Sequence, residues 1–190
     1  MRNTPPKKTS ILLRSLALQL FLNYKTMQGP GYLFALKPEL QGQDEQKVRA
    51  AASLINGHPA FSSVALGAIA ARLREPVDEA KAKEIAEWKR SLSTPLGAIG
   101  DSLIWERFKP ALLAIVVAIM LIAGNKANAL WGWSVVALLL IYNISLWMFR
   151  SWGFTHGFAL GERVSDLALH PALPLVRKVL RVLGIAATAF

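Results

Sequence analysis

No cysteine occurs in this 190-residue chain, which excludes a disulfide framework and any metal site with thiolate ligands. Acidic residues are scarce, since 12 Asp and Glu stand against 22 Lys and Arg, for a formal net charge of +10. The three histidines are not spaced as metal ligands, and no glycine loop of the phosphate-binding kind is present. We find no internal repeat and no low-complexity segment. The sequence therefore predicts one domain without a metal or other cofactor.

Charge is also missing from two neighbouring apolar runs. Residues 127–149 contain no ionisable side chain except Tyr142, and their length matches the roughly 20 residues that cross a hydrocarbon core of about 30 Å. Residues 110–125 are equally free of charge but shorter, and they span a bilayer if tilt or local thinning relieves the mismatch. Only a short connection with Lys126 separates the two runs. The sequence therefore predicts an all-α integral membrane protein with a transmembrane hairpin over about residues 110–149.

The basic residues report the orientation of this hairpin. Lys126 is the one cation in the connection, and the other 21 precede residue 110 or follow residue 149. The positive-inside rule places those flanking segments, and with them the N-terminus, in the cytoplasm. Contact with anionic headgroups then explains the basic excess, so we expect membrane lipid and no nucleic acid as a partner. The sequence thus predicts a protein that crosses a membrane more than once.

The segments before the hairpin are predicted to form short helices. Residues 1–24 have leucines at helical spacing beside polar residues, and Arg14 interrupts the apolar stretch, which fits a retained amphipathic helix better than a signal peptide. The triplet of glycine and proline at 29–31 predicts a helix break. Further helices are expected over 43–55, 62–73 and 78–90, the last of them charged and cytoplasmic. Gly67, in the second of these, would let another backbone approach closely.

Polar residues in two breaks of this pattern are candidate functional residues. Asn56, His58 and Pro59 lie between two mainly apolar helices, where a helix cap followed by a turn is the simpler interpretation. Asp101 stands between glycines and Trp105, directly ahead of the hairpin. It either N-caps a helix that starts near Ser102 or is a functional carboxylate near the membrane, and the residues alone leave both open.

The string GDSL at residues 100–103 is also the signature of a family of serine esterases. In those enzymes it follows a β-strand of a soluble α/β fold, and an Asp-x-x-His element completes the catalytic triad. Here it precedes a membrane helix, and no Asp-x-x-His follows. The wrong context argues against an esterase. We expect no catalytic residue.

Four blocks, NYKTMQGPGYLFALKPEL, INGHPAFSSVALGAIAARL, STPLGAIGDSLIWERFKPAL and WMFRSWGFTHGFALG, occur in this order. Together they resemble the IID membrane subunit of mannose/fructose/sorbose-family sugar phosphotransferase systems over about residues 23–166. The resemblance implies a membrane domain at 25–166 with re-entrant or broken helices, after the N-terminal helix at 1–24. It also implies a C-terminally shortened chain, with only a short apolar tail at 167–190.

The resemblance further implies a role as a permease component in a bacterial inner (cytoplasmic) membrane. In such systems soluble IIA and IIB components pass on phosphate, and IIB phosphorylates a hexose as the IIC–IID complex, a trimer of heterodimers, carries it inward. IID itself is not phosphorylated. The candidate residues for the substrate path or the IIC contact are Asn56, His58, Pro59, Gly97, Gly100, Asp101 and Trp105. By resemblance, Asp101 is expected to be buried at a glycine-rich turn.

Two positions depart from the family pattern. Ser102 replaces the usual proline after the Gly-Asp pair, and Glu106 replaces the usual glycine after the tryptophan. Together with the apparent loss of C-terminal segments, these departures keep a second interpretation open. In it, the chain is a non-transporting regulatory or scaffolding relative of IID.

Overall fold

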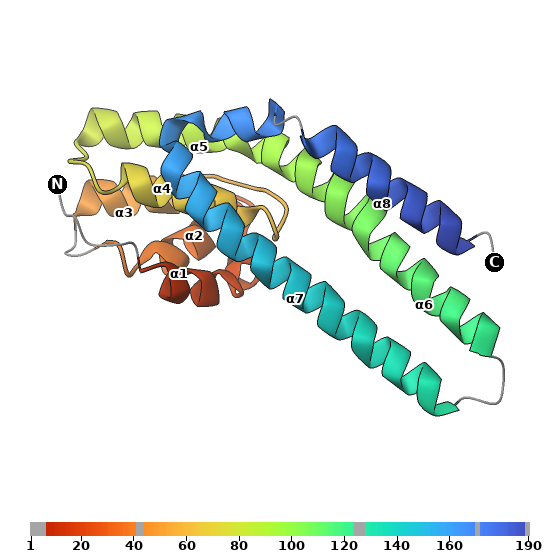
Figure 1. Cartoon of the computed structure of the whole chain (residues 1–190). Coiled ribbons are helices and arrows are strands. Elements are labelled where there is room, and N and C mark those ends of the chain that lie inside the picture. The colour runs from red at the N-terminus through yellow and green to blue at the C-terminus, as the bar shows by residue number, and fades with distance from the viewer. Residues whose placement is uncertain (1–6, 41–43, 124–127, 170–171, 189–190) are drawn as a thin grey trace.

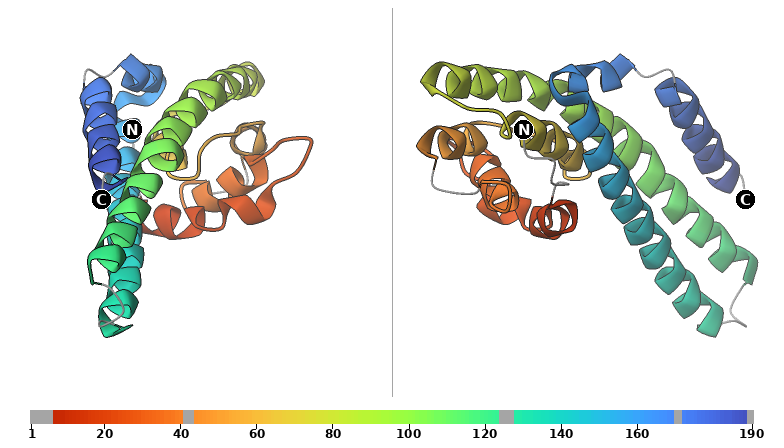
Figure 2. Two further views of the ribbon diagram at one scale, coloured as in Figure 1. Left: turned by 90° about the vertical axis from the view of Figure 1, so that its right-hand side faces the viewer. Right: turned by 60° about the vertical axis from the view of Figure 1, so that its left-hand side comes forward.

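The structure is a computed structural model that describes residues 7–40, 44–123, 128–169 and 172–188. The helices that precede residue 101 gather at one end of the molecule, and those over residues 109–123, 128–160 and 172–188 extend from that end as an arm (Figures 1 and 2). In chain order the elements are α1 (Lys8–Ser15), η1 (Leu18–Phe21), α2 (Gly29–Leu36), α3 (Glu45–Ala52), α4 (Ser62–Arg72), α5 (Glu79–Gly100), η2 (Asp101–Phe108), α6 (Lys109–Ala123), α7 (Asn128–Leu160), η4 (Gly161–Leu169) and α8 (Ala172–Thr188). The described residues form no strand beyond isolated bridges, so the predicted all-α class is confirmed.

Helix α4 lies at the centre of the compact end and packs against the last turns of α7. A methyl group on Gly67 of α4 would lie 2.1 Å from the carbonyl oxygen of Phe154, and one on Gly157 of α7 would lie 2.0 Å from that of Val64. The two backbones therefore touch, because small residues remove the side chains between them. The predicted close approach at Gly67 is confirmed. On α7, Gly153 and Gly157 are spaced as small-xxx-small and face Ser63 and Val64 of α4 in the same way.

The helix predicted over 78–90 extends much further than its sequence pattern indicated. Asp78 caps α5, accepting a hydrogen bond from the backbone N–H of Lys81 at 2.7 Å. The helix then passes through Pro95 and continues without a break into η2 and α6 (Figure 1). Segment η2 is a π-helix, whose i→i+5 hydrogen bonds widen the coil locally. The structure therefore has no turn at Gly100–Asp101, and no helix that begins at Ser102.

A buried lysine joins α5 to the end of α3. Lys89 is 0% exposed, and its Nζ donates to the carbonyl oxygens of Ala50 at 2.9 Å, Ala51 at 2.8 Å and Ser53 at 3.1 Å. The nitrogen also lies 5.7 Å from the centre of the Tyr32 ring, a cation–π contact. Carbonyls at the C-terminus of a helix lack intrahelical partners, so the ammonium satisfies the end of α3. Burial lowers the pKa of Lys89 to about 7.

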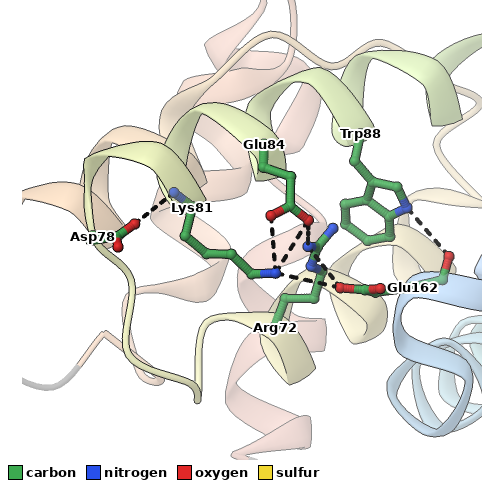
Figure 3. A network of polar contacts seen from close by, with 6 residues as sticks. All are labelled: Arg72, Asp78, Lys81, Glu84, Trp88 and Glu162. Carbon is green, nitrogen blue, oxygen red and sulfur yellow. Dashed lines mark hydrogen bonds and ion pairs between the residues drawn. The ribbon is translucent and has the colours of Figure 1, made fainter.

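An ion-pair network holds η4 against α4 and α5 (Figure 3). The buried guanidinium of Arg72 lies 2.8 Å from the Glu162 carboxylate and also contacts Glu84, while Lys81 approaches both acids. Arg72 stacks on the Trp88 ring at 4.8 Å. Hydrogen bonds from Arg72 and Lys81 lower the pKa of Glu84. The network fixes the direction in which the chain leaves α7.

The arm consists of the predicted hairpin and α8. Within the described residues, one helical stretch, Trp131–Leu167, is long and apolar enough to cross a membrane, and only 6% of its most apolar window is buried. Helix α6 packs beside α7 but is shorter, with 15 residues. The connection with Lys126 lies outside the described residues. Helix α8, in the predicted apolar tail, packs on α6 and η2.

The predicted N-terminal amphipathic helix is shorter than expected and divides into α1 and η1. Its first six residues lie outside the described part of the chain. Arg150 of α7 donates to Ser15 Oγ at 3.1 Å, and Lys8 donates to Thr155 at 2.8 Å. The glycine–proline triplet does not break a helix but forms the first turn of α2. Exposed leucines on α1 and η1 leave an apolar face, as expected of an interfacial segment: Leu13, Leu16 and Leu20.

Candidate functional site

The connection between α3 and α4, residues 53–61, is held in place by the segment before α2. Gln28 is 2% exposed, and its carboxamide forms two hydrogen bonds with the backbone of Gly57, accepting at 3.2 Å and donating at 3.0 Å. The backbone N–H of Gln28 donates to the carbonyl of Ile55 at 2.9 Å. On the other side, the backbone N–H of Asn56 donates to Ser93 Oγ of α5 at 3.0 Å. The connection is therefore an ordered element fixed from two directions.

His58 is buried in this connection and organises the start of α4. Its Nδ1 accepts a hydrogen bond from the backbone N–H of Ala60 at 3.1 Å, and its carbonyl accepts from Phe61 and Ser62. An accepting Nδ1 places the proton of the neutral ring on Nε2. That Nε2 is buried and has no hydrogen-bond partner in the described part of the chain. Burial lowers the pKa of His58, and the carboxylate of Asp101 acts in the opposite direction.

The structure brings the two groups of predicted site residues together around His58. A methyl group on Gly100 would lie 2.2 Å from His58 Cβ, so only glycine permits this contact. The Trp105 ring meets the imidazole edge-on, with centroids 5.5 Å apart. A methyl group on Gly97 would lie 4.0 Å from Gly57 Cα. Residues some 40 positions apart in sequence thus form one site, which the isolated motifs did not reveal.

Asp101 does not occupy the environment expected for it. We expected a buried carboxylate at a broken-helix turn or an N-cap, and the structure instead places an exposed Asp101 in the first turn of η2. Trp105, four positions later, is 60% exposed. Asn56 is exposed as well, and Pro59 is half-buried, its carbonyl accepting from Ser62 Oγ at 2.6 Å. The site therefore presents a carboxylate and an aromatic ring outward, over a buried histidine.

The two positions that depart from the family pattern contact the same side chain. Arg107 donates through one guanidinium nitrogen to the backbone carbonyl of Ser102, to its hydroxyl at 2.7 Å and to the Glu106 carboxylate at 3.0 Å. The serine and the glutamate thus act together to fix an arginine on η2. Neither a proline nor a glycine would supply these side-chain contacts.

The sequence did not predict the residues that fix the site by hydrogen bonds. Gln28, Ser93 and Arg107 belong to no recognisable motif, and only their contacts in the structure identify them. No group of three His, Asp or Glu side chains in the described ranges is placed to hold a metal ion. A buried histidine, an exposed carboxylate and the indole ring of Trp105 instead suit hydrogen bonding and stacking with a neutral polar molecule.

Comparison with known proteins identifies the family. The model of the phosphotransferase system mannose/fructose/sorbose family IID component matches residues 4–189. The fructose permease IID component of Bacillus subtilis (strain 168) is 24% identical over 176 residues, 88% of this chain and 62% of that protein. The chain thus spans about three fifths of the length of this curated relative.

Two solved structures share the fold. One is the structure of a membrane protein, with a TM-score of 0.70 and 19% sequence identity. The match covers 100% of this chain and 70% of that one. The other belongs to the mannose transporter ManYZ in complex with microcin E492, with a TM-score of 0.66 at 20% identity, covering 99% of this chain and 69% of its own. With the family model matching nearly the whole sequence, the chain belongs to the IID permease components of the mannose/fructose/sorbose family of phosphotransferase systems.

Proposed function

We propose that this chain pairs with a IIC subunit to move a hexose across the membrane, with phosphorylation of the sugar by IIB. The observation that carries the proposal is the convergence of the Asn56–Pro59 connection with Gly97, Gly100, Asp101 and Trp105. These residues come from two of the four blocks that resemble IID subunits. Their meeting at one place is what a shared substrate path or partner contact requires.

The chemistry of the site fits a neutral sugar. A hexose offers hydroxyl groups and apolar C–H faces, and it carries no charge. Asp101 supplies a hydrogen-bond acceptor for hydroxyls, and the exposed Trp105 supplies a face for stacking. Beneath them, the unpartnered Nε2 of His58 is a donor that a hydroxyl or a IIC acceptor would satisfy.

Transport with matched variants tests this proposal. Membranes that contain this chain, its cognate IIC and soluble IIA and IIB are assayed for uptake and phosphorylation of labelled hexoses. We expect Asp101→Asn to reduce uptake at least tenfold, while Asp166→Asn, an exposed aspartate of η4, leaves it unchanged. Co-purification with IIC should survive both substitutions. Assembly with IIC but no movement of any sugar by the wild type would instead favour the regulatory or scaffolding role.

We also propose that α6 and α7 both cross the membrane and that the N-terminus is cytoplasmic. The basic residues on one side of the hairpin support this orientation. Because the chain has no cysteine, single cysteines report topology without background labelling. An impermeant thiol reagent added outside cells should label Lys126→Cys, and it should label Lys7→Cys only after permeabilisation. The reverse pattern would contradict the proposed orientation.

A further inference from the structure

A groove between α8 and the η2–α6 segment combines two arginines with small residues. The cavity measures about 320 Å³. Arg107 and Arg181 line it together with Ala111, Ala114 and Gly184. A methyl group on Gly184 would lie 3.7 Å from Ala111 Cβ, so the two helices are close there without touching backbones. The space between the helices is therefore lined by small residues and by two guanidinium groups.

The arginines of the groove have unused hydrogen-bonding capacity. Arg107 directs one nitrogen to Ser102 and Glu106, while its Nε is buried without a partner. Arg181 is exposed and makes no hydrogen bond or ion pair within the described residues. Glu106 also lines the cavity, and its carboxylate offsets one of the two positive charges. One positive charge therefore remains for an anion.

On both helices, the arginines of the groove lie close to the last charged residue before a long apolar stretch. Beyond Lys109, α6 has no ionisable side chain up to Ala123, and beyond Arg181, α8 has none up to Thr188. The two helices run side by side in the same direction (Figures 1 and 2). In a membrane component, the change from charged to apolar residues marks the headgroup layer. The apolar part of the groove then continues from that layer toward the hydrocarbon.

We propose that this groove binds an anionic phospholipid. The phosphate contacts Arg181 and the terminal guanidinium nitrogen of Arg107 that Ser102 and Glu106 do not use, and an acyl chain lies along Ala111, Ala114 and Gly184. Arginine suits the phosphate because its fork of donors matches the phosphate oxygens. Basic pockets between membrane helices are a recurrent form of lipid recognition. The proposal rests on membrane insertion and not on transport, so a failure to transport sugar would leave it standing.

Lipid titration followed by native mass spectrometry tests the site. The full chain, purified with any subunits that remain attached, is titrated with phosphatidylglycerol and with phosphatidylcholine of the same acyl chains. We expect phosphatidylglycerol to bind several-fold more tightly. Arg181→Gln should weaken its binding roughly five- to tenfold, since one cation near a headgroup is worth about 1 kcal/mol or more. Arg181→Lys should recover only part of the affinity, because lysine keeps the charge and loses the fork of donors.

Lys178→Gln is the matched control. It removes the same charge from an exposed position on the same helix that does not line the groove. We expect wild-type lipid affinity in this variant, and an equal loss in both variants would show diffuse attraction instead of a site. Equal binding of the two lipids would overturn the proposal. So would equally strong binding of glycerol phosphate, which has no acyl chain, or loss of an attached subunit from Arg181→Gln with unchanged lipid affinity.

Discussion

Replacing Lys89 by methionine removes the ammonium that satisfies the end of α3. Methionine keeps the length and much of the volume of the lysine side chain, so the change is mainly one of hydrogen bonding. The carbonyl oxygens of Ala50, Ala51 and Ser53 lose the donor that lies 2.8 to 3.1 Å from them. The Ala50 carbonyl keeps the hydrogen bonds that it accepts from the hydroxyl and the backbone N–H of Ser53. The carbonyls of Ala51 and Ser53 lose their donor at a place where the Lys89 side chain is 0% exposed.

The expected loss follows from the two carbonyls that are left without a donor. Each such acceptor costs about 1–3 kcal/mol, so the two cost at least about 2 kcal/mol. Methionine escapes the cost of burying a charge, which is why we take the lower end of the range. For a chain of this size, each kcal/mol shifts the thermal midpoint by about 2–4 °C. Lys89→Met should therefore lower the midpoint by roughly 4–8 °C.

Thermal unfolding of the detergent-purified chain, followed by size-exclusion chromatography after heating, measures this shift. The assay is best run near pH 6, where Lys89 is protonated. Lys83→Met, at an exposed position on the same helix, is the control and should change the midpoint by less than about 2 °C. If the two variants were equally stable, the reasoning about α3 would be refuted.

Three further predictions concern close contacts and pH. Gly100→Ala should destabilise the chain by about 2 kcal/mol or more because its methyl group would overlap His58, whereas Gly97→Ala, with 4.0 Å of room, should be neutral or slightly stabilising in the same thermal assay. Gly67→Ala should force α4 and α7 apart, with a loss of similar size, while Gly132→Ala meets nothing within 4 Å; comparable midpoints for these two would contradict the packing argument. Because burial lowers the pKa of Lys89 to about 7, the unfolded chain holds a proton that the folded chain has released between about pH 7 and 10. Stability should rise with pH across that window, by up to about 1.4 kcal/mol per unit, and a midpoint that is flat from pH 7 to 9, or one that rises equally in Lys89→Met, would count against this origin.

The helices that depend on local patterns were predictable from sequence. The charge-free run in α7, the amphipathic start of α5 and the small residues of α4 correspond to observed elements. The glycine-containing segments were not. Gly29 and Gly100 were interpreted as chain breaks because glycine favours turns, but both lie in helices where a neighbouring group leaves no room for a side chain. Sequence alone does not distinguish a glycine needed for its backbone from one needed for its small size.

The candidate site was predictable in its members and not in its geometry. The motif residues His58, Gly100 and Trp105 do meet. The predicted environment of Asp101 was wrong, because the helix continues through η2 and leaves the carboxylate exposed. The supporting contacts of Gln28 and Ser93 join segments far apart in the chain. Such contacts depend on tertiary packing, which periodicity and spacing do not encode.

A single helical path without a loop runs through α5, η2 and α6, from the ion-pair network near Lys81 to the end of α6. Its 22, 8 and 15 residues give a path roughly 65 Å long, measured along the helix axis. The contact between Gly100 and His58 lies near the middle of this path. One continuous backbone therefore joins the compact end of the molecule to the apolar arm, and the π-helical turns of η2 form the junction.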